Sequence, residues 1–177
     1  MHLTPSELLD RLRGLGIAAD THQHAPVFTV AESRSVKEAV PGAHSKNLFL
    51  KDRKARLFLV VAKDDTAIDL KRLLEVIGAS GRLSFASAEL LRETLGVEPG
   101  SVTPFAAIND RAGRVTVIVD EALAGAERVN FHPLVNTMTT GVGPHELVAF
   151  LRSTGHEPRI LPLPAPVCAA EAVHPSS

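Results

Sequence analysis

Four short polar segments of the sequence could carry chemistry, because each one interrupts an apolar or turn-forming context. They are Lys46-Asn47, "GSVTPF" (100–105), "NFHP" (130–133) and "NTMTTGVGP" (136–144). Each lies at the end of an expected strand, where loops commonly carry binding and catalytic groups. Each alone also fits a structural role, such as a snorkelling lysine, a turn or a hydrogen-bonded core histidine. Together they favour a functional site.

Several common catalytic and cofactor motifs do not occur. The sequence contains no G-x-G-x-x-G, no Walker A loop and no G-x-S-x-G elbow. His22 and His24 have strand spacing, which would place both rings on one face, an arrangement that metal sites use. No cysteine and no helical histidine pair supplies further ligands, so we expect two polar side chains on an exposed strand face. We expect neither a metal nor a cofactor.

The composition predicts one globular domain. The chain has 177 residues, of which 45% are hydrophobic and 22% charged, which suffices to bury a core. A net charge of -1 disfavours non-specific binding to nucleic acid, and the absence of Trp and Tyr disfavours base stacking. A local basic patch is still compatible with this composition. The single cysteine, Cys168, cannot form an internal disulfide. With no signal peptide and no long apolar run, we expect a cytoplasmic protein without a membrane partner.

Caps, apolar spacing and turn residues predict the elements. Thr4 to Glu7 form a capping box for a helix that ends at Gly14 or Gly16. Further helices are expected over 31–40, 68–77, 87–96 and 143–155, and strands over 18–24, 48–50, 57–61, 105–110, 114–120, 128–134, 135–142 and 158–161. Most strands come in neighbouring pairs, one of them a hairpin of 105–110 with 114–120. This pattern favours an α+β fold with a mixed sheet over an alternating parallel sheet.

The polar segments and their neighbours resemble a known family. "HAPVFTVAES", "KNLFLKD", "GSVTPFAAIND" and "FHPLVNTMTT" are similar, in order and spacing, to the YbaK-like aminoacyl-tRNA deacylases. Within that family they most resemble the free-standing alanyl-tRNA(Pro) deacylases related to the editing domain of prolyl-tRNA synthetase. The resemblance implies a mixed, strongly curved β-sheet flanked by helices, with a deacylase domain over 1–161. The Pro/Ala-rich segment 162–177 lies outside the resemblance, and its composition predicts a flexible tail. The resemblance also implies hydrolysis of the ester that joins alanine to tRNA(Pro).

The resemblance assigns catalytic positions to Lys46, Asn47 and His132. The Lys46 ammonium should lie beside a phosphate or ribose of the tRNA end, because the α-amine of the substrate is itself cationic. Asn47 can donate and accept, which suits a ribose hydroxyl or the carbonyl, and His132 could orient a water or hydroxyl. With no evident protein nucleophile, the expected reaction is direct attack by water, assisted by the 2′-hydroxyl of the substrate.

The family's G-x-x-x-P loop corresponds to Gly100–Pro104. Gly100 lets the backbone approach the substrate and Pro104 stiffens the loop, so its amides could stabilise an oxyanion. Ser101 and Thr103 of this loop are predicted to bind substrate. A pocket that admits alanine and excludes the larger proline ring should be small and apolar; its expected walls are Val27, Phe28, Val30 and Leu48.

A basic turn follows the Lys46 strand. Lys51, Arg53, Lys54 and Arg56 could hold the acceptor stem of the tRNA, and a solvated charged turn is an equal alternative. Prolyl-tRNA synthetase is a further candidate partner, and the sequence leaves open whether the two proteins act together. Two other functions also stay open. One is deacylation of cysteinyl-tRNA(Pro) or another small aminoacyl-tRNA, and the other is a non-catalytic nucleic-acid or ligand-binding module on the same fold.

Overall fold

The computed structural model describes residues 2–26 and 29–166 of the chain. Within them lie five α-helices and eight strands, with two short 3₁₀-helices. The helices are α1 (Pro5–Gly14), α2 (Val30–Ala39), α3 (Leu70–Val76), α4 (Ala88–Leu95) and α5 (Pro144–Ser153), with η1 (Pro104–Asn109) and η2 (Glu121–Gly125). The strands are β1 (Asp20–Gln23), β2 (Ala43–Lys51), β3 (Leu57–Lys63), β4 (Ser84–Phe85), β5 (Val115–Asp120), β6 (Val129–Phe131), β7 (Met138–Val142) and β8 (Arg159–Leu161).

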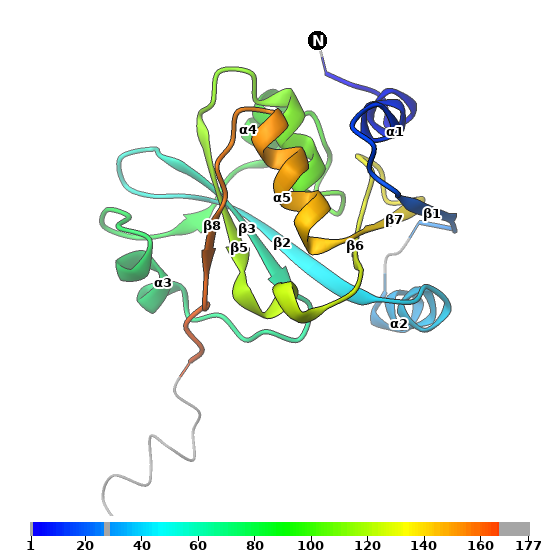
Figure 1. The fold of residues 1–177 in the computed structure, drawn as a ribbon. Coiled ribbons are helices and arrows are strands. Elements are labelled where there is room, and N and C mark those ends of the chain that lie inside the picture. The colour runs from blue at the N-terminus through cyan, green and yellow to red at the C-terminus, as the bar shows by residue number, and fades with distance from the viewer. Residues whose placement is uncertain (1, 27–28, 167–177) are drawn as a thin grey trace, which may run out of the picture.

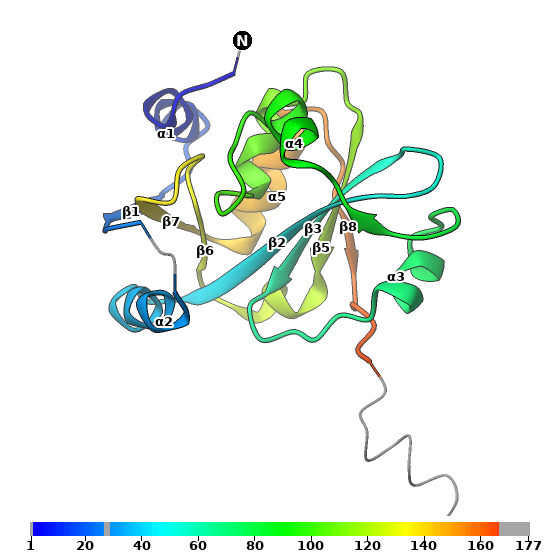
Figure 2. The same ribbon diagram turned by 180° about the vertical axis from the view of Figure 1, so that it is seen from behind.

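The strands form one mixed sheet in the order β1-β7-β6-β2-β3-β5-β8, with β4 paired to β2 (Figures 1 and 2). The sequence-neighbouring pairs β2–β3 and β6–β7 are antiparallel, whereas β2–β6, β3–β5 and β5–β8 are parallel. The prediction of an α+β fold with a mixed sheet is therefore confirmed. β2 is the longest strand at 9 residues, and it joins the two halves of the sheet.

Helices cover both faces of the sheet around β2 and β3. On one face, α1, α4, α5 and η1 pack in a large core that includes Phe105 and Phe150, whose rings meet edge to face with centroids 5.4 Å apart. On the other face, Leu73 of α3 and Ile77, which directly follows the helix, pack against the sheet. The sheet residues in this second core are Leu50, Phe58 and Val60. Figures 1 and 2 show α4 and α5 together on one side and α3 apart from them. Because β3 is covered on both sides, its residues 57–62 are all buried.

Local chemistry explains where the helices begin and end. The predicted capping box is present, because Glu7 N donates to Thr4 Oγ1 and Thr4 N donates to Glu7 Oε1. Ser87 caps α4 by accepting from Leu90 N, and Gly96 ends that helix with φ of 66°. A left-handed C-terminal residue is the position that glycine fills at least cost.

Two strand predictions were wrong. Residues 105–109 form the 3₁₀-helix η1 instead of the first strand of a hairpin, because Pro104 starts a helical turn that Thr103 caps by accepting from Phe105 N. β2 begins at Ala43, five residues before the predicted start at 48. Lys46 and Asn47 consequently lie within a strand and not at its end. Their polarity hid the strand from a search for apolar runs.

The described part of the predicted tail continues along α3. Leu163 packs against the α3 core, and Asp69 N donates to Pro164 O at 2.8 Å. Residues 167–177, including Cys168, lie outside the described residues, so the flexible tail stays a prediction. None of the described helices is long and apolar enough to cross a membrane.

Candidate active site

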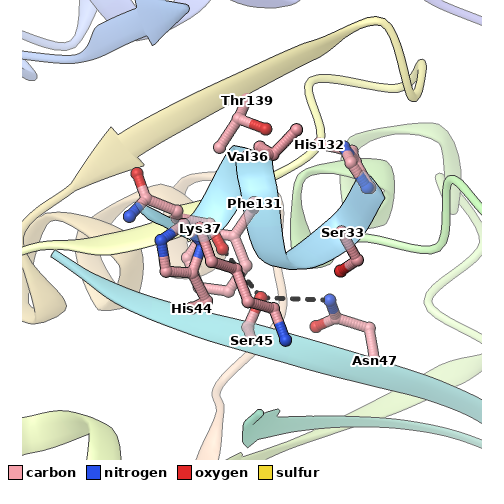
Figure 3. A pocket seen from close by; sticks show the side chains of 10 residues that line it. Ser33, Val36, Lys37, His44, Ser45, Asn47, Phe131, His132 and Thr139 are labelled. Atoms are coloured by element: carbon pink, nitrogen blue, oxygen red, sulfur yellow. Dashed lines mark hydrogen bonds between the residues drawn. The ribbon is translucent and has the colours of Figure 1, made fainter. Parts of the chain in front are cut away.

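A small cavity lies between α2, the first half of β2 and the β6–β7 hairpin (Figure 3). Its volume is about 90 Å³, which is far below the roughly 300–1,000 Å³ of sites for drug-sized ligands. Most of its lining residues are polar, and Val36 and Phe131 are the apolar ones. The lining residues are Ser33, Val36, Lys37, His44, Ser45, Asn47, Asn130, Phe131, His132 and Thr139. Only a small chemical group can enter it.

The structure separates Lys46 from Asn47. Side chains along a strand alternate between the two faces of the sheet. Asn47 lines the cavity, whereas Lys46 is not among the described lining residues and, by local alternation, points to the same face as its neighbour Leu48, which packs on the α3 side. Lys46 is half-buried and forms no ion pair with any described residue. Two adjacent predicted site residues therefore serve opposite faces of β2, and Leu48 does not form a wall of this cavity.

Asn47 is held by a short chain of hydrogen bonds. Its Nδ2 donates to Ser45 Oγ at 3.3 Å, and Ser45 Oγ donates in turn to Asn130 O at 2.8 Å (Figure 3). Asn47 Oδ1 is buried and accepts no hydrogen bond within the described part of the chain. A buried unpaired acceptor costs about 1–3 kcal/mol. Such an atom in a cavity wall is suited to a ligand that brings a donor.

His132 is poised to accept a proton. Its Nδ1 lies 3.0 Å from Met138 O, and because a carbonyl only accepts, Nδ1 must carry the hydrogen. Burial lowers the pKa of His132 below its ordinary value, the hydrogen bond to Met138 opposes this, and the nearby His24 adds to the lowering. The ring is therefore neutral near pH 7, with a lone pair on Nε2. No described residue occupies Nε2, so it can act on a water or hydroxyl.

Two further histidines, His44 and His24, belong to the site, and the sequence did not predict either of them there. His44 lines the cavity, and its Nε2 donates to Val40 O at 3.0 Å. His24 Nε2 lies 2.8 Å from Thr139 Oγ1, and its ring centroid lies 6.4 Å from that of His132. The prediction that His24 lies on an exposed strand face was wrong, because β1 pairs with β7 and brings the histidine beside the β6–β7 hairpin. Only that long-range pairing could have revealed it.

The Gly100 loop lies beside the hairpin without lining the cavity. Gly100 has φ of 94°, and a Cβ built on it would be 4.0 Å from Asn136 Nδ2 in the β6–β7 loop. Ser101, Thr103 and Pro104 are buried. The positive φ explains the glycine, and the cap of η1 gives Thr103 a structural role. Two predicted segments, Gly100–Pro104 and Asn136–Pro144, are thus brought together.

Three predicted wall residues cannot be placed. Val27 and Phe28 lie outside the described residues, and so does the side chain of Val30, the first residue of α2. Within the described chain, Val36 and Phe131 supply the apolar lining instead.

The cations of the basic turn fall into two groups: Arg56 is held by hydrogen bonds within the turn, whereas Lys51, Arg53 and Lys54 form no ion pair with a described residue. Arg56 Nε donates to Asp52 Oδ2 at 2.8 Å, and its NH2 donates to Gly78 O. Burial alone would raise the pKa of Asp52, but N–H groups of Ser80 and Arg56 and the Arg56 guanidinium outweigh it and lower the pKa. Arg56 therefore holds the turn together. Lys51 and Arg53 instead line an open groove with Arg82, and Lys54 is exposed beside them.

The described residues contain no group of three or more His, Cys, Asp or Glu side chains arranged to hold a metal ion. Lys37, the one lysine among the described lining residues, pairs with Asp64 at 2.8 Å. The chemistry available in this cavity is therefore that of imidazole, amide and hydroxyl groups.

Comparison with known proteins shows the family of this chain. Residues 24–150 match the family model of the aminoacyl-tRNA editing domain. The chain is 42% identical over 159 residues to a Xenopus laevis protein named prolyl-tRNA synthetase associated domain-containing protein 1, covering 88% of this chain and 94% of that protein. It is 37% identical over 135 residues to the prolyl-tRNA editing protein ProX of Acetoanaerobium sticklandii, covering 76% of this chain and 82% of that protein.

The fold also matches solved structures. A candidate trans-editing enzyme for prolyl tRNA synthetase superposes with a TM-score of 0.70 at 20% identity, covering 94% of this chain and 100% of that one. At that identity the likeness concerns the fold alone. The resemblance read from the sequence is confirmed by the family model, which spans β2, the Gly100 loop and the β6–β7 hairpin. The chain belongs to the aminoacyl-tRNA editing domain family.

Proposed function

We propose that this protein hydrolyses the ester of mischarged alanyl-tRNA(Pro). The observation that carries the proposal is the 90 Å³ cavity, with His132 held in one tautomer directly after β6 and the unpaired Asn47 Oδ1 on β2. Membership of the editing family and the similarity to a prolyl-tRNA editing protein support the substrate class. The alanine specificity rests on the size of the cavity.

The cavity suits a sieve that works by exclusion. A synthetase pocket shaped for proline rejects the smaller alanine by only about 1–3 kcal/mol, since little binding energy is lost per missing methylene. A second site can use the opposite criterion, because an overlapping ring atom is repelled strongly. The methyl group of alanine would meet Val36 and Phe131, and the ring of proline would overlap the lining.

The proposed reaction is a direct attack by water. The water oxygen bonds to the carbonyl carbon while the neutral His132 Nε2 accepts its proton. The bond from that carbon to the ribose oxygen then breaks, and the ribose oxygen takes up a proton, with the adjacent 2′-hydroxyl assisting. The Gly100–Pro104 loop lies beside the β6–β7 hairpin and outside the cavity lining, so its free amides would stabilise the oxyanion where the carbonyl oxygen projects out of the cavity. Alanine and a free tRNA end result.

The tRNA would lie along β2, with its 3′ end at the cavity. Lys46 faces the other side of the strand from Asn47, and we assign it to a phosphate or ribose near the ester. Lys51 lies five residues after Lys46, about 17 Å along the strand, and Arg53 and Lys54 follow in the turn between β2 and β3. These three cations would contact the acceptor stem. Arg56 is removed from this set, because Asp52 and Gly78 occupy it. Prolyl-tRNA synthetase is a proposed partner, and the proposed location is the cytoplasm.

Single-turnover deacylation of alanyl-, cysteinyl- and prolyl-tRNA(Pro) tests the proposal, with Lys46→Ala and His132→Ala beside the intact protein. We expect rapid loss of alanine, retention of proline and a large loss of rate in both variants. Full activity of Lys46→Ala would remove that lysine from the mechanism. Preferred turnover of the cysteinyl ester would support the cysteinyl-tRNA(Pro) alternative. No turnover of any ester would leave a non-catalytic binding module on the same fold.

A further inference from the structure

The hydroxyl of Thr139 lines the cavity and is held by a histidine from a neighbouring strand. His24 Nε2 lies 2.8 Å from Thr139 Oγ1, and His24 Nδ1 lies 2.8 Å from Ala25 O. The backbone N–H of His24 donates to Thr137 O at 2.9 Å, which extends the β1–β7 ladder by one residue. The imidazole is therefore fixed through both nitrogens and through its own backbone.

These contacts fix the direction of the Thr139 hydroxyl. The carbonyl of Ala25 can only accept, so His24 Nδ1 carries a hydrogen. In the neutral ring Nε2 then presents a lone pair, and the Thr139 hydroxyl donates to it. The hydroxyl proton is thereby directed at His24, and the lone pairs of Oγ1 are left for a donor in the cavity. Thr139 is only 4% exposed, so bulk water does not compete freely for them.

The opposite wall supplies a second acceptor. Asn47 Oδ1 on β2 is buried without a partner in the described structure, because the amide nitrogen is turned towards Ser45. Among the described lining residues there is no carboxylate, and the single ammonium group, that of Lys37, pairs with Asp64. The cavity therefore offers neutral acceptors from two strands.

We propose that Thr139 and Asn47 receive the α-ammonium group of the aminoacyl ester, and that His24 is the positioning residue for Thr139. An ammonium group carries three donors and no acceptor, so it can use both oxygens at once, whereas a hydroxyl donates only one hydrogen. A charged group that loses its water needs such partners. The placement of Lys46 on the other face of β2 keeps a like charge away. This inference rests on the proposed function and names the part of the substrate that the cavity reads.

A matched pair of substrates separates this role from a structural one. Propionyl-tRNA(Pro) keeps the carbon skeleton of the alanyl ester but carries hydrogen in place of the amine. Thr139→Val should lower kcat/KM for the alanyl ester by about 10- to 100-fold, the range for a hydrogen bond to a charged group. It should leave the propionyl ester within about twofold, and Thr139→Ser should keep most of the activity on both.

His24 is tested through Thr139. His24→Gln supplies an amide oxygen that can accept from the hydroxyl, so this variant should keep most of the activity. In His24→Leu, kcat/KM for the alanyl ester should fall to the level of Thr139→Val, and kcat/KM for the propionyl ester should not change. The double variant His24→Leu/Thr139→Val should lose no more than either single one, because both remove the same contact. Equal losses on both esters, or additive losses, would overturn the proposal. Thermal unfolding of each variant shows whether it is folded.

The failure of the proposed function would look different. If the intact protein hydrolyses neither ester, the ammonium site can still be tested by binding of stable amides, 3′-alanylamino-3′-deoxyadenosine and its propionyl counterpart. Calorimetry should then show tighter binding of the alanyl compound to the intact protein and no difference between the two for Thr139→Val. Equal binding of both compounds to the intact protein would overturn the inference.

Discussion

His132 Nδ1 lies 3.0 Å from Met138 O, across the loop that joins β6 to β7. This contact holds the ring in the tautomer that leaves Nε2 free, and burial lowers the pKa of the same ring. One hydrogen bond across this loop therefore leaves Nε2 of a neutral ring free, and Nε2 is the atom that the proposed reaction uses as its base.

The pH dependence of deacylation should show this base. Because the pKa of His132 is lowered from 6.5, Nε2 stays unprotonated as the pH falls to that value, and the rate should decline only below it. His132→Ala should lose both the rate and this acid limb. The measurement is kcat/KM for the alanyl ester between pH 5 and pH 8. An acid limb centred above pH 6.5 would contradict the assignment.

The same shift predicts a stability change. The unfolded chain takes up a proton at His132 near pH 6.5, before the folded chain does, so protons bind preferentially to the unfolded state. The contribution of this residue to the free energy of unfolding is present above pH 6.5 and declines as the pH falls through that value towards the folded pKa. Urea denaturation at pH 7.5 and pH 5.5 should give a smaller difference for His132→Gln than for the intact protein.

Replacing Asn47 by leucine should raise the stability of the protein and abolish its activity. Asn47→Leu removes the unpaired buried acceptor, which costs about 1–3 kcal/mol, and keeps the same branched arrangement of side-chain heavy atoms. We expect the free energy of unfolding to rise by about 1 kcal/mol while deacylation of the alanyl ester is lost. Lys46→Met is the matched control on the adjacent position, and its stability should change by less than about 0.5 kcal/mol. Lower stability of Asn47→Leu would show that the amide is satisfied in solution.

The two arginines of the basic turn should behave differently. Arg53→Ala should weaken tRNA binding and reduce the slope of log K against log salt by about 0.7–0.9, the value for one phosphate contact. Arg56→Ala should leave that slope unchanged and lower stability, because it removes the partner of the buried Asp52. Filter binding over a range of salt concentrations, with urea unfolding of both variants, separates the two effects. An equal loss of slope would show that Arg56 also contacts RNA.

A buried pair outside the site should matter for stability alone. His156 Nε2 lies 2.9 Å from Asp110 Oδ2, which also accepts from Val115 N, and both side chains are almost fully buried. Thr154 Oγ1 donates to Leu151 O, so it accepts from His156 Nδ1. His156→Ala leaves the carboxylate without this partner and should cost about 3 kcal/mol, the low end for a broken buried pair. Deacylation by the folded variant should be unchanged.

The local elements could largely be predicted from the sequence. The capping box at Thr4, the stop at Gly96 and the mixed sheet with paired strands follow from residue type and spacing, because caps and turns depend on neighbouring residues. The chemistry-bearing segments at Asn47 and His132 could also be found. Residues 105–109 could not be assigned correctly, since an apolar run of that length suits a buried 3₁₀-helix as well as a strand.

The assembly of the site was decided by the tertiary structure. Asn47 and His132 share a cavity because β2 pairs with β6 in parallel, and His24 reaches Thr139 because β1 pairs with β7 over more than a hundred residues. The side chains of Lys46 and Asn47 point to opposite faces because β2 begins at Ala43, so both residues lie within the strand, where neighbouring side chains alternate. The sequence by itself determined which residues could do the chemistry and which segments fold locally. Strand order and register, set by burial over the whole chain, decided which of those residues meet.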